Sequence, residues 1–210
     1  MQGKLRKWRS MNLRSPLTIL VVLFMSLGLL SCKSAIHDDR VVVLDTSYGR
    51  IVIELLPDDA PKHVTNFRDL IENGFYDGTK FHRIVKDNAK LVAVQGGDPN
   101  TISGDPSTWG AGQPGQRTVS AEFSRTLKHV RGTVSAARKG NDPDSATSQF
   151  FICASSEAQW DGKYSIFGRV IDGMNVIDTM VRAPVFPNTE RPLDPVVIKH
   201  AFLSRRGDLK

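Results

Sequence analysis

Two polar side chains occupy a segment in which most other residues are apolar or form turns. Arg83 belongs to the string FHRI, and Gln95 begins the string QGGD. An arginine presents five N–H donors in a rigid planar group, so it can stabilise a lone pair or a negative charge that develops during a reaction. By itself, such an arginine is more often a solvated side chain on the outside of a sheet. The pair therefore predicts hydrogen-bond chemistry only if other residues complete a site.

The remaining reactive residues argue against several other chemistries. Cys153 lies in the apolar run QFFICAS, which predicts a buried, inert thiol and no intrachain disulfide with the only other cysteine, Cys32. No group of His, Cys, Asp or Glu has the spacing of metal ligands, so we expect no metal and no other cofactor. His63 and His129 are interpreted as surface residues without a role.

The charge of the chain is concentrated at its N-terminus. The net charge is +6, but residues 1–31 hold five basic and no acidic residues. Residues 32–210 therefore carry 28 − 5 = 23 basic against 22 acidic residues, a net charge of +1. Without a basic stripe on the body of the protein, nucleic-acid binding is not expected.

The basic N-terminus precedes a mostly apolar run from Leu17 to Leu30. That run is short for a membrane span and typical of a secretory signal. Its end, LLSC, resembles a bacterial lipobox, in which the cysteine is lipidated and becomes the mature N-terminus. We therefore predict a signal peptide at 1–31, and a lipidated Cys32 with a short linker at 32–39.

Two alternatives remain for this leader: an uncleaved anchor helix, and a true start at Met11. Whether Cys32 is lipidated or the leader stays as an anchor helix, we expect the body to be tethered to a membrane and to lie outside the cytoplasm. The predicted location is the bacterial cell envelope, facing the periplasm. Lys33 follows the cysteine in place of the aspartate associated with inner-membrane retention in some bacteria. This favours the outer membrane.

The body alternates short strands with two helices. Apolar strands flank a Ser-Tyr-Gly turn at 41–56, which predicts a hairpin. Residues 58–74 predict a helix that Asp58 or Asp59 caps, with Pro61 in its first turn. Further expected elements are a long Gly- and Pro-rich loop at 96–123, strands at 131–136, 148–153 and 165–171, a helix at 172–182, and a last strand at 195–204. Together these indicate a β-barrel or sandwich with helical plugs.

Six strings carry a resemblance to a known family: FHRI at 81–84, QGGD at 95–98, KHVRGTVSAAR at 128–138, SQFFI at 148–152, DGKYSIFGRV at 161–170 and GMNVID at 173–178. In this order and spacing the chain resembles a cyclophilin, a peptidyl-prolyl cis–trans isomerase. The resemblance implies a closed eight-stranded antiparallel β-barrel capped by two α-helices. We place this domain at 40–205, with a tail at 206–210, and expect a monomer.

The resemblance also implies a groove on the outside of the barrel that holds proline-containing polypeptides. It assigns the catalytic cation to Arg83, the orienting amide to Gln95 and the aromatic floor to Phe151. The residues that it implies for substrate binding are His82, Val92, Ala93, Ala137, Arg138, Gln149, Trp160 and Tyr164.

The chain departs from the family pattern at three places. Four residues are inserted between FHRI and QGGD, which puts Val92 and Ala93 where relatives have Phe and Met. The usual tryptophan position holds Gln159, while Trp160 takes the next position. Because that tryptophan often governs cyclosporin binding, the shift leaves cyclosporin binding open. Tyr164 stands where a histidine is common, and its ring can pack on proline with the hydroxyl in water.

Three functions compete at this stage. The first is a lipid-anchored isomerase that assists the folding of exported proteins. The second is a chaperone or scaffold that binds proline segments without useful turnover, for which the altered wall at Val92 and Ala93 is the only support. The third is a tethered barrel that carries a lipophilic ligand, and it predicts an open interior not filled by side chains.

Overall fold

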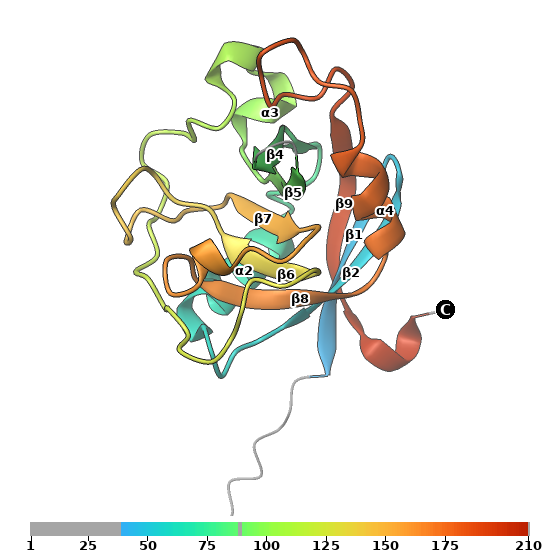
Figure 1. The fold of residues 1–210 in the computed structure, drawn as a ribbon. Coiled ribbons are helices and arrows are strands. Elements are labelled where there is room, and N and C mark those ends of the chain that lie inside the picture. Colours follow the sequence, from blue (N-terminus) through green and yellow to red (C-terminus); the bar gives the residue numbers. More distant parts are fainter. Residues whose placement is uncertain (1–38, 88–89, 210) are drawn as a thin grey trace, which may run out of the picture. The chain divides into compact units, whose positions relative to one another are not determined.

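Nine antiparallel strands form one nearly closed barrel in the computed structural model (Figure 1). The structure describes residues 39–87 and 90–209. The strands are β1 (Arg40–Thr46), β2 (Gly49–Leu55), β3 (Lys80–Phe81), β4 (Arg83–Asp87), β5 (Lys90–Gly96), β6 (Thr133–Ala136), β7 (Phe150–Cys153), β8 (Ile166–Asp172) and β9 (Val196–Arg205). The helices are α2 (Pro61–Glu72), α3 (Asn100–Ser103) and α4 (Met174–Val181), with 3-10 turns at 106–108, 158–160 and 206–208.

The predicted leader and Cys32 lie outside the described residues. Within 39–87 and 90–209, no helix is both long enough and apolar enough to cross a bilayer.

The barrel closes through one interrupted strand. The sheet order is β3-β9-β1-β2-β8-β6-β7-β5-β4, so its two ends are consecutive in sequence. Only His82 separates β3, which pairs with β9, from β4, which pairs with β5. The predicted eight-stranded barrel is therefore confirmed in its architecture, and the ninth strand arises because one expected strand is split at His82.

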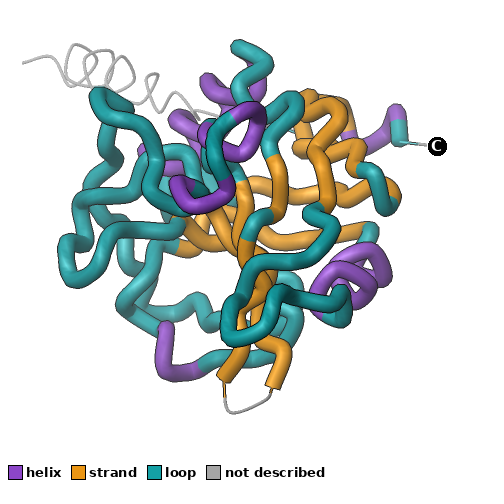
Figure 2. The backbone as a smooth tube through the Cα atoms, turned by 90° about the horizontal axis from the view of Figure 1, so that it is seen from above, coloured by secondary structure: helices purple, strands orange, loops and turns teal. Residues whose placement is uncertain are grey.

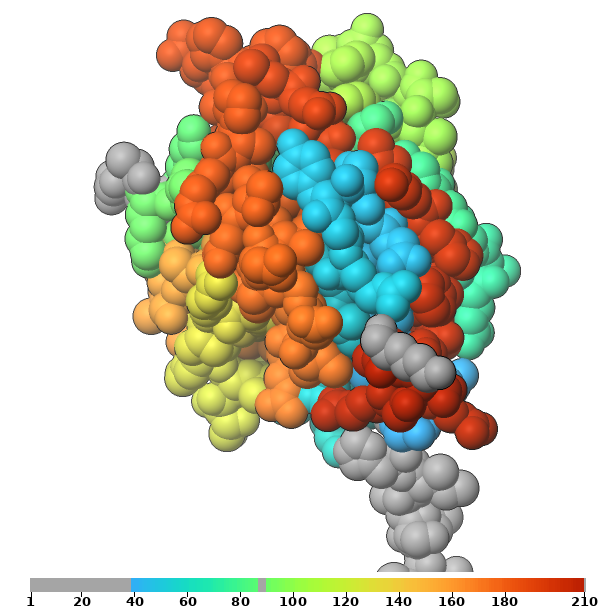
Figure 3. All heavy atoms as spheres, turned by 90° about the vertical axis from the view of Figure 1, so that its right-hand side faces the viewer, coloured from blue at the N-terminus to red at the C-terminus, as the bar shows by residue number. Residues whose placement is uncertain are grey.

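The predicted hairpin is confirmed at the N-terminal edge of the domain. β1 and β2 pair antiparallel from Val41↔Glu54 to Thr46↔Gly49. β9 lies on the other side of β1, so the two ends of the domain sequence are neighbours in the sheet. Figure 3 shows the red atoms of β9 directly beside the blue atoms of β1.

Helix α2 begins with Pro61 as predicted, but its capping differs from the prediction. The N-cap is Ala60, with no side-chain cap from Asp58 or Asp59. Instead the carboxylate of Glu122, far along the chain, accepts from the backbone N–H groups of Lys62 and His63, both at 3.0 Å. A carboxylate at a helix N-terminus is favourable for the exposed donors and for the helix dipole.

His63 is buried, with 4% of its surface exposed, so its interpretation as a surface residue is wrong. Its Nδ1 lies 2.7 Å from Glu122 Oε2. Burial lowers the pKa of His63, although the neighbouring carboxylate works in the opposite direction.

Helix α4 begins at a glycine that no other residue can replace without strain. Gly173 has φ +89°, and a Cβ there would lie 2.3 Å from the carbonyl oxygen of Arg50. The helix buries Val176, Ile177, Met180 and Val181 and packs against β2, β4 and β5. It therefore covers part of the barrel, as α2 does over β8 and β9.

The barrel interior is filled by side chains. Phe150 sits at its aromatic centre, with ring centroids 5.3 Å from Phe67, 5.7 Å from Tyr76 and 5.8 Å from Phe81. Aliphatic residues from most strands complete the same buried cluster. The lipophilic-carrier interpretation is therefore wrong, because it required an open interior.

Candidate active site

One row of side chains crosses the outer face of four neighbouring strands. The register pairs Arg83 in β4 with Gln95 in β5, Gln95 with Phe151 in β7, and Phe151 with Ser135 in β6. Residues that pair directly across a sheet lie on the same face. Residues twelve and more positions apart are thus brought together, whereas Phe150, next to Phe151, enters the interior cluster.

Arg83 is held by two acceptors. Its Nη1 donates to Gln95 Oε1 at 3.2 Å, and its Nε donates to Glu190 Oε2 at 2.5 Å. The side chain nevertheless keeps 46% of its surface exposed. The guanidinium group is therefore both oriented and accessible.

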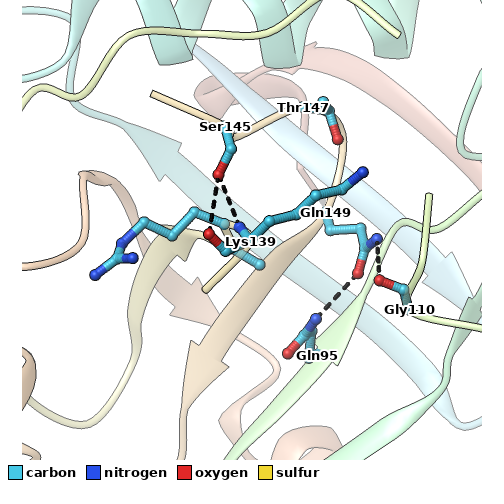
Figure 4. A pocket seen from close by; sticks show the side chains of 8 residues that line it. Gln95, Gly110, Lys139, Ser145, Thr147 and Gln149 are labelled. Atoms are coloured by element: carbon cyan, nitrogen blue, oxygen red, sulfur yellow. Dashed lines mark hydrogen bonds between the residues drawn. The ribbon is translucent and has the colours of Figure 1, made fainter. Parts of the chain in front are cut away.

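Gln95 is itself oriented from the other side. Its Nε2 donates to Gln149 Oε1 at 3.0 Å, and Gln149 Nε2 donates to the carbonyl oxygen of Gly110 at 3.0 Å (Figure 4). Gln149 is buried, so this relay is fixed at its base. The amide oxygen of Gln95 is left to accept from Arg83.

An aromatic patch lies beside the relay. Phe151 forms edge contacts with Trp160 and Tyr164, at centroid distances of 5.1 and 5.4 Å. Together with Ala93 and Cys153 these rings form an apolar cluster separate from the interior one. Trp160 and Tyr164 are half-buried, so part of their ring surface stays accessible beside Phe151, whose register neighbour is Gln95.

A Ser, His and Asp group lies behind that patch. His129 Nδ1 is 3.0 Å from Asp161 Oδ1, and its Nε2 is 3.0 Å from Ser135 Oγ. Ser135 has no exposed surface and His129 only 1%, so no substrate reaches the hydroxyl or the imidazole. The imidazole lies nearly parallel to the Phe151 ring, at 6.0 Å and 18°, and so supports that ring from behind.

The burial of His129 contradicts its interpretation as a surface residue. Burial lowers its pKa, and the hydrogen bond to the carboxylate of Asp161 opposes that shift. The two residues fall within the strings KHVRG and DGK, so a signal for them existed in the sequence. No sequence signal existed for the contact between His129 and Asp161, because residues 32 positions apart share no local pattern.

Three predicted binding residues have little or no accessible surface. Val92 and Ala93 are fully buried, and His82 is 5% exposed. Ala93 belongs to the outer cluster with Phe151, while Val92 belongs to neither the outer nor the interior cluster. The structure therefore leaves Val92 and Ala93 no accessible surface, and it leaves His82 as little as Phe151, which is also 5% exposed. Burial lowers the pKa of His82.

A small polar pocket opens next to Gln95 and Gln149. Its lining residues are Gln95, Gly110, Ala137, Arg138, Lys139, Ser145, Thr147 and Gln149 (Figure 4). Arg138 lies over the Tyr164 ring, with its guanidinium carbon 4.8 Å from the ring centroid. The predicted residues Ala137 and Arg138 thus connect the pocket with the aromatic patch.

Metal or thiol chemistry finds no support among the described residues. Cys153 is buried, and this burial raises the pKa of its thiol to about 12, so the reactive thiolate is disfavoured. No group of three or more His, Cys, Asp or Glu side chains in 39–87 and 90–209 is arranged to hold a metal ion.

Glu190 is the site residue that sequence reasoning missed. It lies 107 residues after Arg83, in the string VFPNTERPLDP. The Pro, Asn and Thr around it signal a turn, but nothing local signals contact with β4. Only the path of the folded chain brings its carboxylate to the guanidinium group.

Residues 41–202 match the model of one protein family, described as cyclophilin type peptidyl-prolyl cis-trans isomerase/CLD. Among similar proteins is peptidyl-prolyl cis-trans isomerase-like 3 of Gallus gallus, 42% identical over 160 residues, which are 75% of this chain and 92% of that protein. Peptidyl-prolyl cis-trans isomerase CYP18-1 of Arabidopsis thaliana is 40% identical over 154 residues, 72% of this chain and 88% of that protein.

Solved structures show the same likeness. A cyclophilin type peptidyl-prolyl cis-trans isomerase of Cryptosporidium parvum superposes with a TM-score of 0.67 at 33% identity, covering 78% of this chain and 98% of that one. The cyclophilin AquaCyp293 of Hirschia baltica gives a TM-score of 0.62 at 26% identity, covering 82% and 76% of the two chains.

Proposed function

The chain belongs to the cyclophilin-type peptidyl-prolyl cis–trans isomerase family, and from this premise we propose that it isomerises X–Pro bonds at the row formed by Arg83, Gln95 and Phe151. The observation that carries this assignment is the register across β4, β5 and β7. It aligns a cation, its orienting amide and an aromatic ring on one outer face.

The reaction needs a catalyst that binds a twisted amide better than either planar form. Amide resonance gives the X–Pro bond a barrier of roughly 18–20 kcal/mol, although its cis and trans forms have similar energies. Twisting localises a lone pair on the prolyl nitrogen, which becomes a stronger hydrogen-bond acceptor. A fixed donor at that position stabilises the transition state and not the ground states.

Arg83 is the proposed donor. Of the five N–H groups of its guanidinium, two are used by Glu190 and Gln95, and 5 − 2 = 3 are left for a substrate. A preoriented charged donor in a partly apolar site needs little reorganisation as the transition state forms. A rotation about the amide C–N bond breaks no covalent bond, so it requires no covalent nucleophile or metal.

The proposed floor for the proline ring is the patch of Phe151, Trp160 and Tyr164. Their ring faces and edges offer apolar contact to a pyrrolidine without a hydrogen-bond demand. The Cryptosporidium parvum neighbour was solved in the presence of the dipeptide Ala-Pro. The presence of that dipeptide with the neighbour supports proline-containing polypeptides as the ligands of this chain also. We place the peptide backbone next to the polar pocket beside Gln149.

The test is NMR exchange spectroscopy on a short X–Pro peptide with the soluble domain, residues 33–210, and its Arg83→Ala variant. We expect accelerated cis–trans exchange that falls about 10²–10³-fold in the variant, the loss typical of removing one transition-state donor. Wild-type exchange rates in Arg83→Ala would refute the role of Arg83. Changes in the chemical shifts of the peptide without accelerated cis–trans exchange would favour the proline-binding chaperone or scaffold instead.

We propose further that Cys32 carries a lipid and that the domain acts on exported proteins, on the periplasmic side of an outer membrane. The leader sequence supports this. Membrane fractionation of the full chain beside Cys32→Ala tests it: the wild type is expected in the outer-membrane fraction and the variant in the soluble one. Light scattering on the domain tests whether it is a monomer, as expected. The exchange assay with added cyclosporin tests whether the domain binds this drug although its tryptophan is shifted to Trp160.

A further inference from the structure

The loop that follows α4 covers the edge of β4 opposite β5. The backbone N–H of Ile84 donates to the carbonyl oxygen of Glu190 at 2.7 Å. The N–H of Lys86 donates to Glu190 Oε1 at 3.2 Å. β3 pairs with β9, but after His82 the chain continues as β4, which pairs only with β5. The N–H groups on the other edge of β4 would therefore lack a strand partner. Glu190 therefore occupies the seam at which the barrel is least complete.

The loop itself is folded tightly enough to fix Glu190. The N–H of Phe186 donates to Arg191 O at 3.0 Å, and the N–H of Leu193 donates to Pro184 O at 2.8 Å. Asn188 at its tip adopts φ 59°, a left-handed conformation that asparagine tolerates better than most residues. The carboxylate is thus presented by an ordered turn and not by a free loop end.

Within this turn, Glu190 Oε1 faces the β4 backbone while Oε2 accepts from Arg83 Nε. One carboxylate therefore ties the guanidinium group to the strand that carries it. Gln95 binds a different nitrogen, Nη1. Two acceptors in two directions fix both the plane and the rotation of the guanidinium, which a single acceptor does not.

Building on the function proposed above, we infer that Glu190 is a positioning residue for Arg83: it holds the Nε edge so that the Nη groups face the prolyl nitrogen. An arginine side chain that is 46% exposed has considerable rotational freedom unless it is anchored. Anchoring before the substrate arrives means that less entropy is lost in the transition state.

The opposite effect of the same contact would be competition, in which the carboxylate draws Arg83 away from the substrate. The geometry argues against it. Glu190 takes the Nε–H, and the three N–H groups on Nη1 and Nη2 that Gln95 leaves unused have no acceptor among the described residues. The ion pair and the proposed transition-state contact therefore use different donors.

The experiment measures exchange kinetics for the wild-type domain and for Glu190→Ala, Glu190→Gln, Arg83→Ala and the double variant Arg83→Ala/Glu190→Ala. We expect Glu190→Ala to lower kcat/KM about fivefold, the size typical of a partly exposed ion pair, with the loss in kcat and KM nearly unchanged. Glu190→Gln keeps an acceptor oxygen and should recover most of the activity. In the Arg83→Ala background, Glu190→Ala should have no further effect.

Thr189→Ala is the matched control in the same turn. The hydroxyl of Thr189 bonds only within the loop, to Phe186 O and from the N–H of Arg191. Its removal should leave kcat/KM unchanged. A fall equal to that of Glu190→Ala would mean that loop order alone matters, which would overturn the inference.

A second readout does not depend on turnover. The Nε–H signal of Arg83 in ¹⁵N NMR spectra should be protected from solvent exchange in the wild type and in Thr189→Ala, and lose this protection in Glu190→Ala. Unchanged protection overturns the inference, as does a Glu190→Ala enzyme equal to or faster than wild type, or an equal loss in both backgrounds. An inactive wild type would instead remove the proposed function itself, and with it this role.

Discussion

Phe150 and Phe151 are neighbours in β7 and belong to different environments. Phe150 lies in the barrel interior, in edge contact with Phe67, Tyr76 and Phe81. Phe151 lies on the outer face in a small cluster with Trp160 and Tyr164, next to the Arg83 and Gln95 pair. In Figure 2 the strands lie toward the middle of the domain, and loops and helices surround them.

The difference between the faces is one of hydrogen bonding as well as size. The inner side chains are almost all apolar and make one large cluster. On the outer face, polar side chains form a relay from Gly110 through Gln149 and Gln95 to Arg83. Because strand side chains alternate, a single strand can hold the fold on one face and a site on the other. Substitutions on the two faces should therefore separate stability from activity.

The largest expected effect is on the inner face. Phe150→Ala removes a fully buried ring and leaves a cavity among three other rings, which typically lowers the free energy of unfolding by about 3–5 kcal/mol. Urea denaturation of the domain, followed by circular dichroism, measures it. A loss below about 1 kcal/mol would mean that the interior closes around the missing ring.

Phe151→Ala is the matched change one residue along the chain. Its ring is also buried, at 5% exposed, but it belongs to a much smaller cluster on the outer face, so we expect less than half of the Phe150→Ala loss in unfolding free energy. The exchange assay should show kcat/KM reduced by about tenfold or more, since the floor for the proline ring is gone. If Phe151→Ala costs as much stability as Phe150→Ala and no activity, the division between the faces fails.

Acid should lower the free energy of unfolding, because three histidines are buried in the native state. His63, His82 and His129 all have a pKa lowered by burial. The unfolded chain, with histidine pKa values near 6.5, then binds more protons than the native state. The free energy of unfolding therefore falls as the pH drops below about 6.5, by about 1.4 kcal/mol for each unit by which one native pKa is lowered.

Urea midpoints between pH 7.5 and 5.5 measure this slope, in a range above the titration of most carboxylates. His63→Gln should make the slope smaller, because one of the three groups is gone. A midpoint that does not move in wild type between these pH values would contradict the expectation.

The smallest expected effect concerns the edge of the groove. Arg138 lies over Tyr164 and its Nε donates to the carbonyl oxygen of Lys163 at 3.1 Å. Arg138→Ala should reduce kcat/KM about two- to threefold by loosening Tyr164, with less than about 1 kcal/mol lost in stability, as expected for an exposed cation–π contact. A loss comparable to that of Phe151→Ala would show that Arg138 touches the substrate itself.

Local patterns predicted the parts of the fold that depend on local chemistry. Alternating apolar residues indicated the strands, and the Ser-Tyr-Gly turn and Pro61 indicated the hairpin and the start of α2. Because neighbouring side chains of a strand point to opposite faces, the string QFFI also implies an expectation of opposite environments for its two phenylalanines. The placement of Phe150 in the interior cluster and Phe151 in the outer one agrees with this expectation.

The errors share one cause. Asp58 and Asp59 lie in the right place along the chain to cap α2, yet Glu122 supplies the acceptor. His63 and His129 have polar side chains, yet a distant carboxylate allows each of them to be buried. Each misplacement involves a partner between 32 and 60 residues away, and no local periodicity encodes such a partner.

The sequence by itself determined the family, the barrel and the identity of Arg83, Gln95 and Phe151 as candidate site residues, because strand periodicity and the order of short strings are properties of a one-dimensional chain. The tertiary structure alone decided that Val92 and Ala93 are buried and that Glu190 reaches Arg83. Contacts of this kind depend on which surfaces meet after the barrel closes. A loop and a strand that meet at a seam, as the Glu190 loop and β4 do, share no sequence signal, since their distance in space is set by the path of the whole chain between them.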